Sequence, residues 1–433
     1  MKLNTPREPR GKNPCGSPRD KNVHVSMNET PRLAVLYDGT SVSLMEVFEA
    51  ARDFCRILWV VGWSHDESSH RALSRFGDVA DVMGMSESET VSHLVALEPD
   101  GVVVFNDAPI NLAASVASEL GLPFHSPYTA RLLTDKLAQR EALERAGLSV
   151  PAFAAVQLSD FDVKVPFPAV LKPRSGTGGR DTFMVENLDQ VHDALAQCNP
   201  TEEFILEEWL SDQAMLRRLS SDVVSVESVV RDGVLDHVMV TGRFPFAPPF
   251  RETGSFLPSD LVPSDRNDVC ALARAAANAL QIRHGILHTE IKVTQTGPRV
   301  VEVNGRLGGG ISKLISRIGG PSMTVWAMRL ALGLDIGPIP SFGQSPVAFV
   351  RVIVAPESAT RLGTVNGVGE LHELAGVDEV RPNLQPGDAV NFRHSSWNEN
   401  VLRVEGMVNS HAELLTLIDE EIPSTLHLTW DVS

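Results

Sequence analysis

Residues 285–310 restrict the fold more than any other stretch, because their pattern predicts a β-hairpin with acidic residues on one face. Two runs rich in β-branched residues flank a turn signal at residues 295–298, which is typical of two antiparallel strands. With the turn centred on Thr296, the predicted register places Glu290 opposite Glu302. By the same alternation, His288, Lys292 and Asn304 share the face of this pair, whereas Leu287, Ile291, Val293, Val301 and Val303 line the other face.

The opposed carboxylates predict a metal site on this hairpin. Like charges that face each other across two strands destabilise a sheet by about 0.2 to 1 kcal/mol, so we expect a compensating ligand. Glu290, Glu302 and the side-chain oxygen of Asn304 are the kind of donors that Mg²⁺ prefers, and this ion completes its shell with waters and substrate phosphates. The alternative is a solvated polar face on a one-sided sheet.

Arg306 and a run of glycines at residues 308–310 come directly after this set. The guanidinium is always charged, and the glycines give the backbone freedom to reach a substrate. We therefore expect Arg306 to stabilise the negative charge of a phosphoryl group in transfer. A surface arginine in a turn is the alternative.

A glycine-rich loop, KPRSGTGGR, follows a predicted strand and precedes another. Lys172, Arg174 and Arg180 place three cations within nine residues that contain no acid. The loop is neither a Walker A motif nor a GxGxxG motif at the start of a helix, and a purely structural hairpin loop is the alternative. The residues expected to bring the backbone close to a phosphate are Ser175, Gly176, Thr177, Gly178 and Gly179.

Upstream of this loop, short apolar runs at residues 33–37, 56–61 and 101–105 alternate with helix-like segments. Continuous apolar runs separated by helices are typical of a parallel sheet covered on both faces. We therefore expect a small α/β domain that ends near Pro127, preceded by a loose tail over residues 1–30.

The remaining segments give further local predictions. Residues 132–151 fit one helix capped by Thr134, which puts Lys136 in its first turn. Ser264 is expected to cap another helix. The stretch over 245–261 is rich in prolines and aromatic residues and is expected to be an irregular functional loop. Strands are expected over 167–172, 182–186, 203–210, 223–230 and 234–244.

Charge and cysteine content exclude several classes of function. The chain of 433 residues has a formal net charge of −17, which repels phosphate backbones and anionic lipids, so neither nucleic acid nor a membrane is expected as a partner. No secretory signal pattern and no long uncharged apolar stretch is visible, and we expect a reduced, cytoplasmic protein. The cysteines are too far apart to predict a zinc site or a disulfide framework: Cys15, Cys55, Cys198 and Cys270.

Taken in order along the chain, these motifs resemble those of the ATP-grasp superfamily, in particular its amino-acid and peptide ligases, which are carboxylate–amine ligases. The resemblance covers about residues 31–433. It implies an α/β (α+β) ATP-grasp fold with a biotin-carboxylase-like layout. The motifs that carry it are TDK with Lys136, LKPRSGTGGR with Lys172, EEWL at 207–210, SVES with Glu227, HTEIKV, and EVNGRLGGG.

The resemblance also implies a domain order. A Rossmann-like pre-ATP-grasp domain would span residues 31–127 and the ATP-grasp core residues 128–340. The core would consist of a first part, 128–200, with the glycine-rich lid, and a second part, 201–340, with the metal hairpin. A lid-type C-terminal domain over 341–433 would close one side of the site.

Individual roles follow from the same resemblance, which implies ATP as a substrate and Mg²⁺, or Mn²⁺ in its place, as the metal. Lys136, Lys172 and the loop 175–179 would hold the phosphates, and Lys172 and Arg306 would be the catalytic residues. The adenine would lie against the hinge formed by Glu207, Glu208, Trp209 and Leu210, with Glu227 near the ribose. The metal ligands would be Glu290, Glu302 and Asn304.

On the substrate side, the resemblance implies that Glu252 holds an amino group. Some amino-acid ligases carry a histidine three positions after this glutamate and a bulky aromatic residue four positions after the arginine. This chain has Ser255 and Gly310 there, beside Gly309, which suggests a roomier pocket for a larger amino acid, an amine or a peptide.

The implied reaction forms an amide bond through an acyl phosphate and releases ADP and phosphate. Its partners would be a small-molecule carboxylate and an amine, in a setting such as peptide natural-product biosynthesis, and a homodimer is one assembly it allows. Two alternatives remain at this point. One is an ATP-grasp carboxylase that uses bicarbonate, and the other is an inactive nucleotide-binding regulator.

Overall fold

The computed structural model describes residues 30–432 apart from residues 38–41, 63–66, 157–164, 211–218, 249 and 391–399. Almost all of the expected tail therefore lies outside the described residues. Pro31–Ser433 forms one compact unit, separate from Met1–Thr30. The further division of this unit near residues 127 and 340 remains a prediction.

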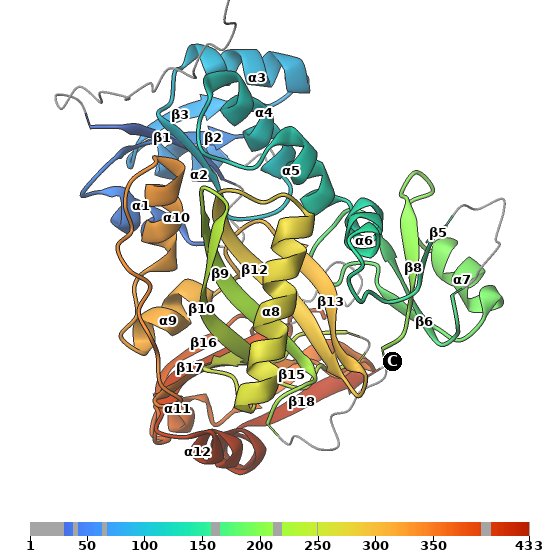
Figure 1. The fold of residues 1–433 in the computed structure, drawn as a ribbon. Helices are drawn as coiled ribbons and strands as arrows, with labels where there is room; N and C mark the ends of the chain where they lie inside the picture. Colours follow the sequence, from blue (N-terminus) through green and yellow to red (C-terminus); the bar gives the residue numbers. More distant parts are fainter. Residues whose placement is uncertain are drawn as a thin grey trace, which may run out of the picture. The chain divides into compact units, whose positions relative to one another are not determined.

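The N-terminal part is built on a parallel sheet of four strands in the order β3-β2-β1-β4. Alternate residues of β1 enter different cores, with Leu33 and Val35 on one side and Ala34 and Leu36 on the other. This confirms the expected sheet with two covered faces. The elements are β1 (Arg32–Leu36), α1 (Leu44–Ala51), β2 (Arg56–Val61), α2 (Glu67–Leu73), β3 (Asp78–Asp81), α3 (Glu87–Ala96), β4 (Gly101–Val104) and α4 (Ile110–Leu120) (Figure 1).

Two helices, not one, cover the segment around Lys136. Helix α5 (Pro127–Thr134) ends at Asp135, and α6 (Lys136–Arg145) begins immediately after it. Asp135 has an extended backbone, and its Oδ1 accepts hydrogen bonds from the N–H groups of Leu137 and Ala138 at 3.0 and 3.2 Å. The cap of α6 is therefore Asp135 and not Thr134, because an aspartate satisfies the free N–H groups of the first turn.

A second, antiparallel sheet has the strand order β5-β8-β6-β7. Its apolar face packs under α7 (Leu188–Leu195), where Val191 and Leu195 join Leu171, Phe204 and Leu206 in one core. We call this sheet the small sheet. Its strands are β5 (Phe153–Val156), β6 (Ala169–Pro173), β7 (Phe183–Val185) and β8 (Phe204–Glu208).

The large sheet has eight strands in the order β13-β12-β9-β10-β11-β14-β17-β16. Helix α8 (Pro263–Ala279) packs against it, and Val262 rather than Ser264 is its N-cap. The stretch 245–261 was expected to be irregular but contains β11, which pairs with β10 and β14. The strands are β9 (Val223–Arg231), β10 (Val234–Arg243), β11 (Gly254–Leu257), β12 (Gly285–Thr294), β13 (Gly297–Asn304), β14 (Val347–Val354), β16 (Val377–Pro382) and β17 (Asn400–Val408).

Residues 341–433 extend this sheet, because β14, β17 and β16 continue it beyond β11. A separate two-stranded sheet pairs β15 (Ala359–Asn366) with β18 (His427–Val432). The remaining elements are α9 (Ile311–Arg317), α10 (Met323–Ala331), α11 (Val368–Leu371), α12 (His411–Thr416), the π-helix η2 (Leu417–Glu421) and α13 (Ile422–Thr425).

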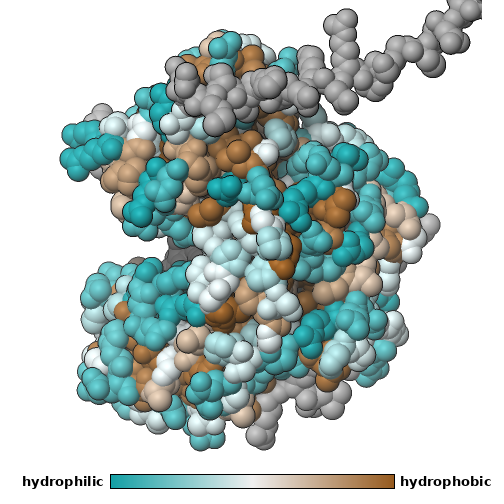
Figure 2. Space-filling model, turned by 60° about the vertical axis from the view of Figure 1, so that its left-hand side comes forward, coloured by the Kyte–Doolittle hydropathy of each residue, from teal (hydrophilic) through white to brown (hydrophobic). Residues whose placement is uncertain are grey.

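Among the described residues, no helix combines the length and the apolar character that crossing a bilayer requires. The face in Figure 2 mixes hydrophilic residues with scattered hydrophobic ones. Exposed large apolar side chains, such as Met45, Val234 and Val262, come from different elements.

Candidate functional site

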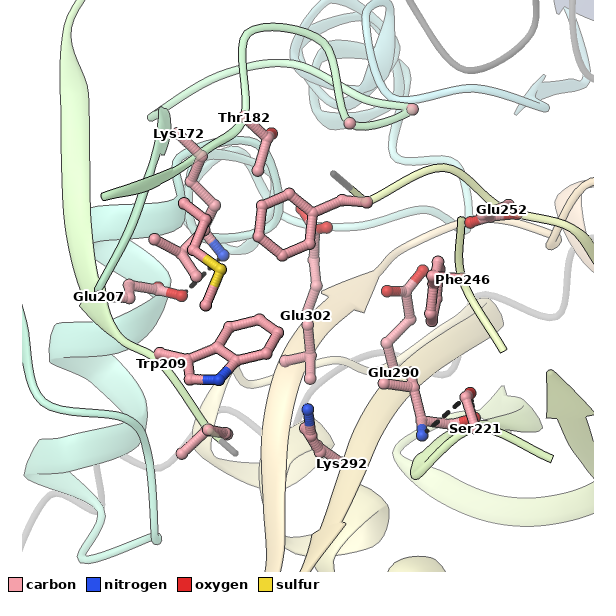
Figure 3. Close-up of a pocket in the computed structure, with 18 of the residues that line it drawn as sticks. Lys172, Thr182, Glu207, Trp209, Ser221, Phe246, Glu252, Glu290, Lys292 and Glu302 are labelled. Carbon is pink, nitrogen blue, oxygen red and sulfur yellow. Dashed lines mark hydrogen bonds and ion pairs between the residues drawn. The ribbon is translucent and has the colours of Figure 1, made fainter. Parts of the chain in front are cut away.

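A cavity of about 620 Å³ lies between the small sheet and the hairpin of the large sheet. Figure 3 shows side chains from both sheets directed into it. It brings together most of the residues singled out from the sequence, namely Lys136, Lys172, Gly176, Thr177, Gly178, Gly179, Glu207, Glu208, Trp209, Leu210, Glu252, Glu290 and Glu302. The expected site residues that do not line it are Ser175, Glu227, Ser255, Asn304, Arg306, Gly309 and Gly310.

The predicted pairs of the hairpin are confirmed, although the structure departs from the predicted register at the turn and at a bulge, and the two departures cancel. Glu290 pairs with Glu302, and the next pair along is His288 with Asn304. Thr294 pairs with Gly297, so the tip is shifted by half a residue from the expected centre at Thr296. A register shift directly after Glu290 then restores the predicted pairs.

The extra, unpaired residue of this bulge is Val301. The sequence placed Val301 on the apolar face, but it lines the cavity, while Val300 and Val303 are buried in the core. A bulge inserts one residue and turns the side chains that follow it to the other face. Strict alternation therefore holds only between bulges.

Each carboxylate of the pair has a cationic neighbour. Nζ of Lys136 lies 3.0 Å from Oε1 of Glu302, and Nη2 of Arg243 lies 2.9 Å from Oε1 of Glu290. Burial raises the pKa of Glu290, but Arg243 and the hydrogen bond from His288 outweigh burial and hold this pKa well below its usual range. Lys136 begins a helix, where the dipole disfavours a cation, and Glu302 compensates for that placement.

The donor chemistry at the pair fits a hard divalent cation. Among the described residues, no three His, Cys, Asp or Glu side chains form a metal-binding group, so the protein offers two carboxylates at this point. Magnesium is commonly bound in that way, by one or two carboxylates together with phosphate oxygens. Asn304 is buried beside the pair, donates a hydrogen bond to the carbonyl oxygen of His288 at 3.2 Å, and has its side-chain oxygen 3.4 Å from Nη2 of Arg306.

A buried ion-pair network anchors Lys172. Nζ of Lys172 lies 2.7 Å from Oε2 of Glu207, and Nε of Arg140 lies 2.7 Å from the other oxygen, Oε1 (Figure 3 shows the first pair). Arg140 also donates a hydrogen bond to the carbonyl of Val301 in the hairpin. Burial raises the pKa of Glu207, but Arg140 and Lys172 together lower it to about 2. The Glu207 side chain is thus engaged by these two cations.

Arg140 is not among the site residues predicted from the sequence. A usable signal was present, because Arg140 lies four residues after Lys136 and shares its face of α6.

The glycine-rich loop has the backbone that its sequence predicts. Gly176, Gly178 and Gly179 have φ angles of 143°, 67° and 70°, which favour glycine. Nζ of Lys136 donates a hydrogen bond to the carbonyl of Gly176 at 2.7 Å, and Oγ of Ser175 donates to the carbonyl of Thr134 at 3.1 Å. Ser175 therefore faces α5 instead of the cavity.

Two cations of this loop are engaged by acids from outside it, which the sequence did not reveal. Arg174 contacts Asp135 at 2.5 Å and Glu203 at 2.9 Å. Arg180 pairs with Glu202 and with Asp181. Lys136 and Lys172 line the cavity, and Arg180 lines it as well while it pairs with these two acids, whereas Arg174 does not line it.

The structure corrects the expected place of Glu227. Its side chain is fully buried, and Nδ1 of His288 lies 3.0 Å from both of its oxygens. Thr241 donates a further hydrogen bond to it at 3.2 Å. Glu227 therefore supports His288 from below the cavity and cannot reach a ribose in it. The burial follows from its position on β9, a central strand of the large sheet.

Glu252 lines the cavity, and Nη1 of Arg243 contacts its Oε1 at 2.5 Å. Ser255 lies outside the cavity, on β11, where it pairs with Arg243 across the sheet. Trp209 forms an aromatic wall between two other cavity residues: Nζ of Lys292 lies 4.7 Å from its ring centroid and the ring of Phe250 lies 5.7 Å away.

Arg306 lies in the turn between β13 and α9 and is turned toward the N-terminal sheet. Its Nη2 contacts Oδ2 of Asp107, in the loop after β4, at 2.7 Å. Both Asp107 and, more weakly, Glu302 raise the pKa of Arg306 against the effect of its burial. Gly309 is exposed in the same turn, and Gly310, with a φ of 75°, precedes α9 as its N-cap.

The chain is similar to known proteins in sequence and in fold. Residues 133–310 match the ATP-grasp domain model. The chain is 32% identical over 260 residues to carnosine synthase 1 of Gallus gallus, a match that covers 55% of this chain and 28% of that protein. It is 25% identical to the L-arginine-specific L-amino acid ligase of Bacillus subtilis over 346 residues, which cover 77% of this chain and 81% of that protein.

The chain spans less than half of the length of the carnosine synthases that it matches, since the Homo sapiens protein is covered over 40%. Among solved structures, an L-amino acid ligase from Bacillus licheniformis superposes with a TM-score of 0.73 at 19% identity, covering 93% of this chain and 99% of that one. The biotin carboxylase domain of the Hydrogenobacter thermophilus 2-oxoglutarate carboxylase gives a TM-score of 0.61 at 15% identity, covering 93% and 91%. These likenesses show the fold expected from the sequence.

Proposed function

Since the chain carries an ATP-grasp domain and has the fold of ATP-grasp ligases, we propose that it is an ATP-dependent, ADP-forming carboxylate–amine ligase. It would join the carboxylate of an amino acid or related acid to the amine of an amino acid or peptide. One observation carries the proposal: Lys136, Lys172 and the carboxylates of Glu290 and Glu302 line a single cavity. This arrangement suits a metal-bound triphosphate. The relatives named carnosine synthase 1 and L-arginine-specific L-amino acid ligase support the choice of an amine over other acceptors.

In this proposal the phosphates lie between the two lysines and the glycine-rich loop, residues 175–179. The loop's positive-φ glycines carry no side chain, so the backbone can come close to the phosphate oxygens. The adenine lies against the hinge, residues 207–210, where Trp209 offers an aromatic surface and backbone groups offer hydrogen bonds. No ribose contact is assigned to Glu227, because that side chain is buried.

Glu290 and Glu302, with Asn304 beside them, are the residues that would hold Mg²⁺ or Mn²⁺. When bound there, the ion would neutralise phosphate charge and orient the triphosphate. Lys136 and Arg243, which contact the two carboxylates, would hold the pair in place. Lys172 would be held against the phosphates by its fixed contact with Glu207.

The reaction then proceeds in two steps, phosphoryl transfer and amide formation, in which residues of this chain bind the substrates and stabilise charge. The substrate carboxylate attacks the γ-phosphorus, the bond to the β–γ bridging oxygen breaks, and ADP leaves. Arg306 stabilises the charge of the acyl phosphate, and Glu252 holds the substrate's amino group. The amine then attacks the acyl carbon and displaces phosphate, while the glycine-rich loop excludes the water that would hydrolyse this intermediate. The roomier acceptor pocket expected from Ser255, Gly309 and Gly310 stays a prediction, because these residues do not line the cavity.

The experiment that tests this function measures phosphate release by the purified chain with Mg²⁺ and ATP across a panel of amino acids, amines and peptides, with mass detection of products. We expect release that depends on an amine and a product whose mass equals the two substrates minus water. Release that depends on bicarbonate instead would favour the carboxylase alternative. Nucleotide binding without turnover across the whole panel would favour the inactive regulator.

Several finer expectations stay predictions: the setting in peptide natural-product biosynthesis, a homodimer, and a cytoplasmic location. The described cysteines, Cys55, Cys198 and Cys270, are free thiols, which suits a reducing compartment.

A further inference from the structure

The candidate catalytic arginine is held by a residue that lies far away in the sequence. Arg306 and Asp107 are separated by 199 positions, yet Nη2 of Arg306 donates a hydrogen bond to Oδ2 of Asp107 at 2.7 Å. Both side chains are largely buried, with exposures of 15% and 14%. A buried charge requires a partner, so Asp107 fixes where the guanidinium rests.

Asp107 occupies a particular place in the N-terminal sheet. It follows the carboxyl end of β4, and its carbonyl accepts a hydrogen bond from Ile110 at the start of α4. In the strand order β3-β2-β1-β4, the chain runs outward from β1 to β3 and then crosses back to β4 on the other side of β1. The crevice between β1 and β4 is therefore the topological switch point, where open α/β sheets characteristically place functional residues.

Besides their contact with each other, Arg306 and Asp107 both keep polar atoms that can form further hydrogen bonds. Nε of Arg306 and Oδ1 of Asp107 are buried and have no hydrogen-bond partner among the described residues. Arg306 makes only long further contacts, of 3.4 Å, to the carbonyl of Leu307 and to the side chain of Asn304. A guanidinium has five N–H donors, so an anionic substrate group can be bound while the contact to Asp107 persists.

We propose that Asp107 is a positioning residue for Arg306, through which the N-terminal α/β part takes part in the reaction. This inference rests on the proposed function. Asp107 holds the arginine in one orientation before substrate arrives, so that the charge of the acyl phosphate meets a donor that needs no reorganisation. The same contact places Arg306 beside Asn304, the residue next to the carboxylate pair.

The test compares steady-state kinetics of the full chain with those of Asp107→Asn and Asp107→Glu. For Asp107→Asn we expect kcat to fall about 10- to 100-fold, the scale expected when a reacting group is displaced by about 1 Å. KM for ATP should stay unchanged, because the nucleotide residues lie on other elements. Asp107→Glu retains the carboxylate and should recover part of kcat. The matched control is Asp78→Asn on the same sheet, whose exposed carboxylate pairs with Arg32 at 3.5 Å and should leave kcat unaltered.

A second measurement separates positioning from a structural role. If Asp107 acts through Arg306, then adding Asp107→Asn to Arg306→Lys should lower kcat no further. Equal additional loss in the double variant overturns the proposal, as does a wild-type or raised kcat for Asp107→Asn alone. A folding defect would appear as the same loss in Asp107→Glu, with a lowered thermal midpoint, and also overturns it. Wild-type protein without amine-dependent turnover overturns the proposed function and this inference together, whereas an active wild type with an equally active Asp107→Asn overturns the inference alone.

Discussion

The buried network of Arg140, Glu207 and Lys172 yields a prediction whose size follows from the structure. Glu207 lies between two cations, 2.7 Å from each, and is 4% exposed. Replacing it with alanine leaves Arg140 and Lys172 facing each other without an anion. Breaking a buried pair by removal of one partner costs about 3–5 kcal/mol.

The lowered pKa of Glu207 points to a stabilisation of similar size. A pKa of about 2 in place of 4.5 means that the folded protein stabilises the ionised carboxylate by about 3 kcal/mol, since each pH unit corresponds to about 1.4 kcal/mol. Because the folded-state pKa is lowered, this contribution is complete above pH 4.5 and declines as the pH falls toward 2. The two figures agree, so we expect Glu207→Ala to lose about 3–5 kcal/mol and Glu207→Gln, which keeps the volume, to lose less.

The assay is urea denaturation at pH 7 of the full chain and its variants. The matched control is Glu203→Ala, directly before β8, because Glu203 also pairs with an arginine, Arg174 at 2.9 Å, but is 73% exposed. An exposed pair contributes about 0.2–1 kcal/mol, so the control should unfold almost as the wild type does. Equal small losses in Glu207→Ala and Glu203→Ala would refute the reasoning, because they would mean that Glu207 is not needed to neutralise the two cations.

Three further predictions concern the site and its support. Glu302→Ala should abolish phosphate release, while its free energy of unfolding in urea stays within about 1 kcal/mol of the wild-type value. The loss of stability is small because Glu302 is a half-buried cavity residue opposite a like charge. Unchanged turnover would remove Glu302 from the site. Asp135→Ala should cost about 0.5–2 kcal/mol by removing the cap of α6, and Asp135→Asn, which keeps the capping oxygen, should cost less in the same urea titration. Burial lowers the pKa of His125 to about 4, so the unfolded chain binds a proton at a higher pH than the folded chain does. The free energy of unfolding should therefore fall by up to about 3 kcal/mol as the pH drops from 6.5 to 4. His125→Gln should lack this part of the pH profile of stability, and a variant with the wild-type profile would contradict the prediction.

The sequence by itself determined the local structure around the site. Alternation and turn chemistry predicted the hairpin and the opposed positions of Glu290 and Glu302, since a side-chain period of two and a tight turn act over neighbouring residues. The pairing in the structure also depends on the bulge after Glu290, which alternation does not reveal. Continuous apolar runs were sufficient to predict β1, β2 and β4 as strands covered on both faces. Spacing of glycines and cations located the loop, residues 172–180, that faces the hairpin across the cavity.

Only the tertiary structure decided which charged groups face the cavity and which are engaged elsewhere. It paired Arg174 and Arg180 with acids outside their loop, buried Glu227 beneath His288, and joined Arg306 to Asp107. Periodicity and capping describe interactions between residues a few positions apart, whereas these contacts join strands and loops that meet only after the sheets have assembled. The pattern along the chain therefore names the candidates for the site, and long-range packing selects among them.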